Sequence, residues 1–337
     1  MQNAVGLTEV NGFNRFEFTG RDAQGFLDRM ICGTLPKRAG RVGLAYLLNH
    51  HGMLKSEATI ANIPASDRGP DRIWYGSAAA SELHDMDWLT QHINAGEDVE
   101  IRSLTNEQTI LVLAGPKAQA VLQSVSRADW SDAAFPWLSV RECFLGIAPA
   151  TVMAVSFSGE RAYEIHVPNA SLYAAYSDLR AAGQAHGLKL FGALAVDSMR
   201  LEKGYLHWKA DILTEFDPYE TGLERFVKMQ KPAFVGQEAL ARRTKAVPSK
   251  RLVTMTLEAR DAPAHGGASV ILDGRVVGTV TSGGWGHRVQ KNIAYAFVAP
   301  ECAAVGQVLE IDSLGQTVAA EVVHPALYDP QMERVRG

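Results

Sequence analysis

Arg200 is the side chain in this sequence that most clearly requires a chemical partner. It lies in the run ALAVDSMRLEK, residues 193–203, which has the spacing of a buried helix. A cation inside an apolar helix costs free energy unless an anion compensates its charge. Asp197, three residues earlier, is the local candidate for that anion. A carboxylate elsewhere in the chain or on a ligand is the functional alternative.

Two carboxylates on predicted strands are candidates for acid–base or binding chemistry. Glu57 lies in LKSEATI, where alternation places it on one face with Lys55. Glu164 follows Tyr163 in AYEIHV, again at strand spacing. For both glutamates a solvated strand face is the competing interpretation, and the residues alone favour it.

The familiar cofactor and nucleophile motifs are absent from the sequence. It has no P-loop, no GxSxG and no HExxH, and the glycine-rich run SGGWG, residues 282–286, lacks the GxGxxG order and is interpreted as a turn. The adjacent pair His50 and His51 is expected at a hairpin tip, without further ligands at metal spacing. We therefore predict no metal site, and no flavin or nicotinamide site of the chain's own.

The composition is that of a globular protein with two or three domains. The chain has 337 residues, of which 47% are hydrophobic and 21% charged, and its formal net charge is −4. This charge favours neither a nucleic acid nor a membrane as a partner. Three widely spaced cysteines, with no signal peptide and no apolar run of spanning length, predict a cytoplasmic location.

Periodicity predicts alternating strands and helices in the first part of the chain. Strands are expected at 13–19, 43–48, 55–61, 73–77, 147–157 and 163–168, and helices at 21–31, 81–95, 116–124 and 171–186. The runs 99–103 and 109–114 are predicted to pair with each other. After Pro248 about six short strands with Gly, Pro and Asp turns indicate a small β-barrel or sandwich, and a domain boundary near residues 245–250.

The run from Ala193 to Leu240 resembles the signature of the aminomethyltransferase family. This family includes the T-protein of the glycine cleavage system and the folate-binding half of dimethylglycine and sarcosine dehydrogenases. The matching segments here are MRLEKGYLHW, DPYETGL and FVGQEAL. Further similar segments follow the family's order along nearly the whole chain: FTGRDAQGFLDRM, AYLLNHHGMLKSEATI, LVLAGPKAQAVL, FSGERAYEIHV and GRVVGTVTSGGW. The similarity is greatest to the dimethylglycine dehydrogenase branch.

The resemblance implies an α+β fold in the form of a three-domain cloverleaf. Ferredoxin-like α+β domains and a small antiparallel C-terminal β-barrel would surround a central folate cleft. The expected first domain is discontinuous, 1–48 with 146–246, and is shortened at its N-terminus relative to the family. The second domain is expected at 49–145 and the barrel at 249–337.

The resemblance also implies tetrahydrofolate as the cofactor and suggests its ligands. Glu164 stands at the family's pterin-binding glutamate, where a carboxylate can accept the pterin N–H and amine together. Arg200 stands at the arginine of the folate cleft, to meet a polar group of folate or Glu164 itself, and Tyr163 and Trp208 are further cofactor-binding candidates. Glu57 stands where glycine-cleavage enzymes carry a catalytic aspartate, and would move a proton as a one-carbon unit is captured.

The function implied is tetrahydrofolate-dependent transfer of a methylene or methyl group from an N-methylated amine of the dimethylglycine or sarcosine type. The chain would accept an iminium or formaldehyde equivalent made by a separate flavin-dependent dehydrogenase or oxidase, or remove a methyl group directly. One alternative is a non-catalytic folate-binding accessory protein, although Tyr205 stands where the KGCxxGQE motif of that branch has cysteine. Another is a folate-binding subunit of a hetero-oligomeric amine oxidase.

Overall fold

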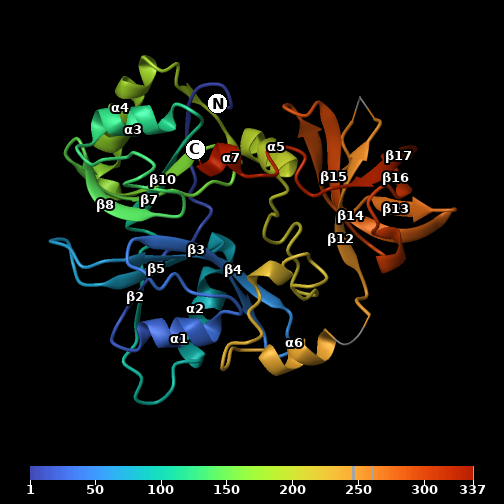
Figure 1. The fold of residues 1–337 in the computed structure, drawn as a ribbon, viewed down its shortest axis with the longest axis horizontal. Coiled ribbons are helices and arrows are strands. Elements are labelled where there is room, and N and C mark those ends of the chain that lie inside the picture. The colour runs from blue at the N-terminus through green and yellow to red at the C-terminus, as the bar shows by residue number, and fades with distance from the viewer. Residues whose placement is uncertain (245–246, 260–261, 337) are drawn as a thin grey trace.

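The chain folds into three lobes, two of them α+β and the third a closed barrel (Figure 1). The computed structural model describes residues 1–244, 247–259 and 262–336. The α+β fold with an antiparallel C-terminal barrel, expected from the sequence, is confirmed. No helix in the described ranges is both long and apolar enough to cross a bilayer.

The first lobe contains a five-stranded sheet in the order β3-β4-β5-β2-β6. Its strands are β2 (Phe16–Thr19), β3 (Arg41–Leu48), β4 (Leu54–Ile63), β5 (Arg72–Gly76) and β6 (Glu100–Ser103). Helices α1 (Ala23–Met30) and α2 (Glu82–Gln91) pack on one face of this sheet. Helix α1 buries Ala23, Phe26, Leu27 and Met30, which share one face at helical spacing, and lies on the side away from the second lobe (Figure 1).

The second lobe contains a six-stranded sheet in the order β11-β1-β7-β10-β9-β8. Its strands are β1 (Gly6–Glu9), β7 (Gln108–Ala114), β8 (Val140–Leu145), β9 (Ala148–Met153), β10 (Ala162–Pro168) and β11 (Lys189–Leu190). Helices α3 (Ala118–Val125) and α4 (Leu172–Gln184) cover its apolar core. The opposite face meets the first lobe through an interlobe layer of buried side chains: Val42, Ala61, Ile63, Trp74, Leu104, Val140 and Met153.

The predicted pairing of residues 99–103 with 109–114 is wrong, because the two strands belong to different sheets. Strand β6 pairs with β2 at the edge of the first sheet, whereas β7 lies between β1 and β10 in the second. The burial of each strand explains the separation. Strand β6 alternates exposed and half-buried residues, as an edge strand can, while β7 is mostly buried and needs partners on both sides.

The third lobe is a closed barrel in the order β12-β15-β14-β13-β16-β17. Its strands are β12 (Arg251–Leu257), β13 (Ser269–Leu272), β14 (Arg275–Gly286), β15 (Lys291–Val298), β16 (Val308–Ser313) and β17 (Gln316–Val323). The run 282–286, interpreted from its glycines as a turn, is instead the end of β14. A Cβ atom at Gly283 would stand 2.0 Å from the Ala264 carbonyl oxygen, so the glycine allows close packing there.

The expected division into domains stays a prediction, but the sheets group the chain differently. The expected boundary after residue 48 falls between β3 and β4, which pair with each other. The expected boundary after residue 145 likewise falls between the paired strands β8 and β9. Residues 245–246, where the expected first domain ends, lie outside the described residues. Grouped by sheet, residues 16–103 form one lobe, enclosed in sequence by the strands of the other.

Truncating the core of α1 should destabilise the first lobe. We expect Phe26→Ala to lower the free energy of unfolding by about 3–5 kcal/mol, because Phe26 is fully buried against the sheet. The exposed Gln24→Ala on the same helix is the control, with an expected change within about 0.5 kcal/mol. Urea denaturation of both variants measures the difference, and equal losses would contradict the assigned helix face.

Candidate functional site

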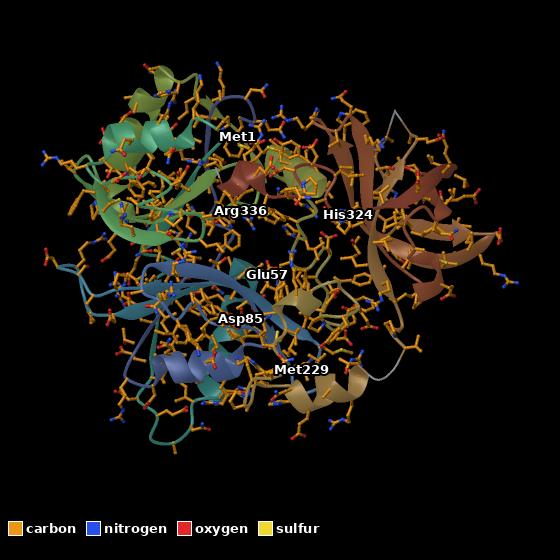
Figure 2. The ribbon with its side chains drawn as sticks, viewed as in Figure 1. Met1, Glu57, Asp85, Met229, His324 and Arg336 are labelled. Carbon is orange, nitrogen blue, oxygen red and sulfur yellow. The ribbon has the colours of Figure 1, made fainter. Side chains whose placement is uncertain are left out.

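Glu57 lies on β4, on the face of the first sheet turned toward the second lobe. The ladder is regular from Ser56 to Asn62, so Glu57, Thr59 and Ala61 share one face, and Ala61 belongs to the interlobe layer. Figure 2 shows Glu57 near the middle of the molecule, among the three lobes. The side chain is half-buried, so the solvated strand face considered from the sequence does not describe it.

Tyr46 holds the Glu57 carboxylate. The two residues are direct partners in the β3–β4 ladder, and the Tyr46 hydroxyl donates a hydrogen bond of 2.7 Å to Glu57 Oε2. Burial raises the pKa of Glu57 to about 7, while the Tyr46 hydrogen bond acts in the opposite direction. Burial also raises the pKa of Tyr46 well above its ordinary value, so the phenol stays a donor at neutral pH. A carboxyl with this pKa can exchange a proton near neutrality.

Trp208 lies on the loop that packs beside this pair. It is half-buried and contacts an apolar cluster that contains Tyr46, Leu54 and Ile212. A backbone hydrogen bond of 3.0 Å from Leu54 N to Phe216 O ties the same loop to the start of β4. The structure therefore brings Trp208 to the neighbourhood of Glu57, as two parts of one packed region.

Glu164 lies on β10 and faces the first lobe. Its neighbour on the same face is His166, which packs edge-on against Trp74 of β5 with ring centroids 4.8 Å apart. The Glu164 side chain remains 22% exposed, and the nearest ionisable contact is His166 Nε2 at 3.6 Å from Oε2. Glu57 and Glu164 therefore border the same interlobe layer from facing sheets.

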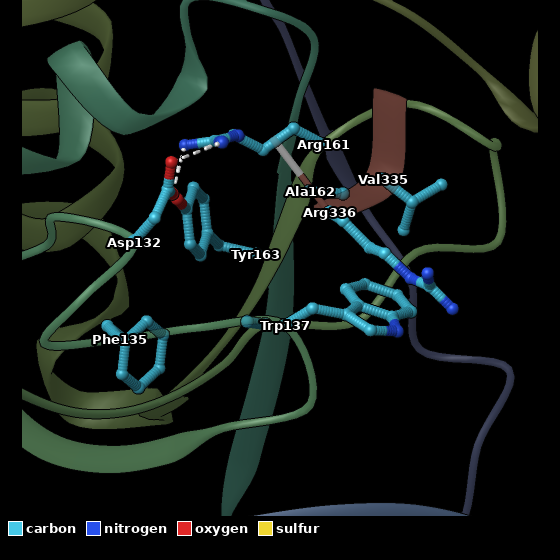
Figure 3. Close-up of a pocket in the computed structure, with 9 residues that line it drawn as sticks. Asp132, Phe135, Trp137, Arg161, Ala162, Tyr163, Val335 and Arg336 are labelled. Atoms are coloured by element: carbon cyan, nitrogen blue, oxygen red, sulfur yellow. Dashed lines mark hydrogen bonds and ion pairs between the residues drawn. The ribbon is translucent and has the colours of Figure 1, made fainter. Parts of the chain in front are cut away.

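Tyr163 points to the other face of β10, away from Glu164. It lies in the core of the second lobe, 3% exposed, against Trp130 and Phe135. Figure 3 shows its ring beside the Asp132–Arg161 ion pair, whose atoms are 2.8 Å apart. Strand alternation places Tyr163 and Glu164 on opposite faces, so the two cofactor-binding candidates are not brought together.

Arg200 is buried near the end of α5 (Ala193–Lys203), with its polar contacts inside the protein. Its Nε lies 2.7 Å from Asp197 and its Nη1 2.5 Å from Asp211, a carboxylate that is fully buried. Nη2 donates to Ser282 Oγ at 2.8 Å, and the guanidinium lies over the Tyr295 ring at 5.4 Å. Although burial opposes its charge, Asp211 and Asp197 more than compensate, and the pKa of Arg200 is raised.

The contacts of Arg200 make it a brace between α5 and the barrel. The Asp197 partner expected from the sequence is present, together with Asp211, which the sequence did not indicate. Within the described ranges, the ion pairs of Arg200 do not include Glu164. Its role as a folate ligand stays a prediction.

Two residues that contact the candidate site residues, Tyr46 and Asp211, were not predicted from the sequence, for different reasons. The Asn49–Gly52 turn was only a partial signal for Tyr46, because the register that it sets would place Tyr46 opposite Ser56, and an irregularity between Leu47 and Leu48 shifts Tyr46 opposite Glu57. Asp211 had no such signal, since it lies in an irregular loop eleven positions after its partner. The described residues contain no group of three or more His, Cys, Asp or Glu side chains that could hold a metal.

Comparison with known proteins agrees with the fold and with the order of the segments. A model of the GCVT N-terminal domain matches residues 1–231, and one of the glycine cleavage T-protein C-terminal barrel domain matches residues 250–329. Mitochondrial dimethylglycine dehydrogenase of Homo sapiens is 33% identical over 96% of this chain, which spans 37% of that relative. Aminomethyltransferase of Thermoanaerobacter pseudethanolicus is 27% identical, with 97% of this chain and 87% of the relative covered.

The fold has a counterpart among solved structures. The crystal structure of glycine cleavage system aminomethyltransferase T from Bartonella henselae superposes with a TM-score of 0.86 at 22% identity, over 98% of this chain and 88% of that one. Fold and site thus define a three-lobed α+β protein with two carboxylates on facing sheets. The chain belongs to the glycine cleavage T-protein family, a family of folate-binding enzymes and enzyme domains.

The Glu57 carboxyl should make stability depend on pH. Its pKa of about 7 in the folded protein lies above the ordinary 4.5, so its contribution to stability is present at low pH and is lost as pH rises through about 7. We therefore expect Glu57→Gln to gain stability relative to the wild type between pH 5 and pH 8. Thermal unfolding across this range tests the sign.

Tyr46→Phe should raise the pKa of Glu57 further, because the hydrogen bond that lowers it is removed. An unchanged midpoint for the titration of Glu57 would contradict the hydrogen bond.

The two carboxylate partners of Arg200 should differ in their contribution to the free energy of unfolding. We expect Asp211→Ala to destabilise by about 3–5 kcal/mol, because it leaves a buried cation with a half-exposed partner. Asp197→Ala should cost no more than about 1 kcal/mol, since this carboxylate is 46% exposed. Urea denaturation of both variants makes the comparison, and a larger loss from the Asp197 change would refute the assigned hierarchy.

Proposed function

We propose that this chain transfers a one-carbon unit from an N-methylated amine to tetrahydrofolate. The observation that carries the proposal is Glu57, a half-buried carboxyl with a pKa of about 7, which borders the same interlobe layer as Glu164. The position of Glu57 in the family pattern, together with its environment, favours a role in proton transfer over a role in packing.

The two glutamates have the free acceptor capacity that a reduced folate requires. In the described part of the chain, Glu57 accepts one hydrogen bond, from Tyr46, and its second carboxylate oxygen is available. Glu164 is partly exposed, and its 3.6 Å contact with His166 is longer than a hydrogen bond. Both residues therefore fit a ligand that presents N–H donors.

Each residue then has a distinct part. Bound tetrahydrofolate would supply the amine nitrogens that take up the one-carbon unit. Glu164 would accept the paired N–H groups of the pterin and so fix the ring, while Glu57 would take up or return a proton near the reacting nitrogens. Tyr46 keeps the Glu57 carboxylate in one orientation, and Trp208 would offer an aromatic surface to the ligand. The cleft that holds the folate would lie among the three lobes.

The proposed donor is a compound of the dimethylglycine or sarcosine type. An iminium or formaldehyde equivalent would come from a separate flavin-dependent oxidoreductase, and we place both in the cytoplasm. Because this chain spans 37% of dimethylglycine dehydrogenase, a second candidate is a folate-binding part of a larger amine-oxidising assembly. Co-purification of a yellow flavoprotein would favour that candidate over a free-standing enzyme.

Substitution of the two glutamates should separate chemistry from binding. With a dimethylglycine-oxidising flavoprotein as the donor system, we expect Glu57→Gln to lower the formation of 5,10-methylenetetrahydrofolate by roughly 10²- to 10⁴-fold with little change in tetrahydrofolate affinity. Glu164→Gln should instead weaken tetrahydrofolate binding, measured by calorimetry.

Glu100→Gln, on the exposed edge of β6, is the matched control and should change neither quantity. If the wild type does not bind tetrahydrofolate, or if Glu57→Gln turns over at the wild-type rate, the proposed mechanism is wrong.

A further inference from the structure

His166 is a buried imidazole that lacks a hydrogen-bond partner within the described residues. Its side chain is 1% exposed, and neither Nδ1 nor Nε2 meets a donor or acceptor there. Buried polar side chains are nearly always paired, because an unpaired one loses its interaction with water and gains nothing in return. The presence of His166 at this position therefore requires an explanation.

The surroundings of His166 offer it no protein partner across the layer. Its ring packs edge-on against Trp74, at an interplanar angle of 73°, and the indole nitrogen of Trp74 also lacks a hydrogen-bond partner among the residues that the structure describes. The remaining neighbours of Trp74 in the layer are aliphatic, including Ala61, Ile63 and Met153. Such a layer would pack equally well around an apolar side chain, so packing alone does not account for a histidine.

Glu164 is the acceptor that His166 can reach. The two residues share one face of β10, and the 3.6 Å between Nε2 and Oε2 exceeds a hydrogen bond by less than 1 Å. An ionised carboxylate offers about four acceptor positions. Glu164 can therefore accept from His166 on its protein side while it accepts from a ligand on its exposed side.

We propose that His166 is a positioning residue for Glu164. When the carboxylate engages the pterin, the Nε2–H of His166 closes onto Oε2 and fixes the plane of the carboxylate, while Trp74 holds the imidazole in place. An imidazole buried without a partner among the described residues costs free energy, and this is the cost of placing the donor beside Glu164. The inference rests on the proposed function, because it assigns Glu164 to the bound folate.

A substitution series at position 166 separates positioning from packing. We expect His166→Phe to raise the Kd for tetrahydrofolate roughly tenfold, the loss of one hydrogen bond to a charged group. The melting temperature of the ligand-free variant should equal or exceed that of the wild type, because an unpaired polar group is removed. His166→Gln, which keeps a donor near the Nε2 position, should recover most of the affinity.

Ile165→Val is the matched control, since Ile165 points into the opposite core of the same strand and should leave the Kd unchanged. Wild-type affinity in His166→Phe would overturn the proposal. A loss of affinity accompanied by a lower melting temperature and no recovery in His166→Gln would assign the residue to packing, and would also overturn it.

A measurement without ligand distinguishes a failure of this inference from a failure of the proposed function. In the protein without folate, Glu164→Gln should shift the imidazole ¹⁵N resonances of His166, because the carboxylate 3.6 Å from Nε2 is replaced by a neutral amide. If those resonances are unchanged, the coupling is absent whatever the protein binds. If they shift while the wild type does not bind tetrahydrofolate, the coupling stands and the proposed function fails.

Discussion

The arrangement of the three lobes depends on the buried end of helix α5, where charged side chains are held without contact with water. Arg200 is compensated by Asp211 and joins the helix to the barrel. Glu202, fully buried, accepts backbone N–H groups from the barrel, and Lys203 binds Asp329 of the C-terminal segment at 2.6 Å. Buried charges are tolerated only with such partners. One turn of helix therefore fixes the barrel and the C-terminal segment against the α+β lobes.

The interlobe layer affects both the packing of the lobes and the pKa of Glu57. Apolar contacts between the two sheets bury Trp74, Ala61 and Met153, and this contact sets the sheets face to face. Burial of Glu57 beside this layer raises the pKa of its carboxyl, because a charged carboxylate is poorly solvated there. A looser junction would leave Glu57 in water, with the ordinary pKa of a carboxyl. The raised pKa of Glu57 is thus a property of the packing around β4.

Local patterns in the sequence predicted what local forces determine. The buried face of α1, the β3–β4 hairpin and the short strands of the barrel follow from periodicity and turn residues. Contacts between distant segments did not: nothing local to Arg200 indicates Asp211, and nothing in β6 and β7 shows that they separate. The grouping of Tyr163 with Glu164 is a different case, because strand alternation alone places the two side chains on opposite faces. The roles of the candidate site residues came from the family resemblance, and the structure added Tyr46 and His166 as candidates.

The order of strands has a consequence for synthesis of the chain on the ribosome. All five strands of the first sheet lie between residues 16 and 103, so that lobe has its full set of strands early. Strand β1 precedes them but pairs with β7 and β11, the latter at residues 189–190. Strand β1 therefore stays without its partner β7 until about a hundred further residues, which include all strands of the first lobe, have been synthesised. The sheet of the second lobe is complete only after β11, its last strand in the chain, has been made and has paired with β1.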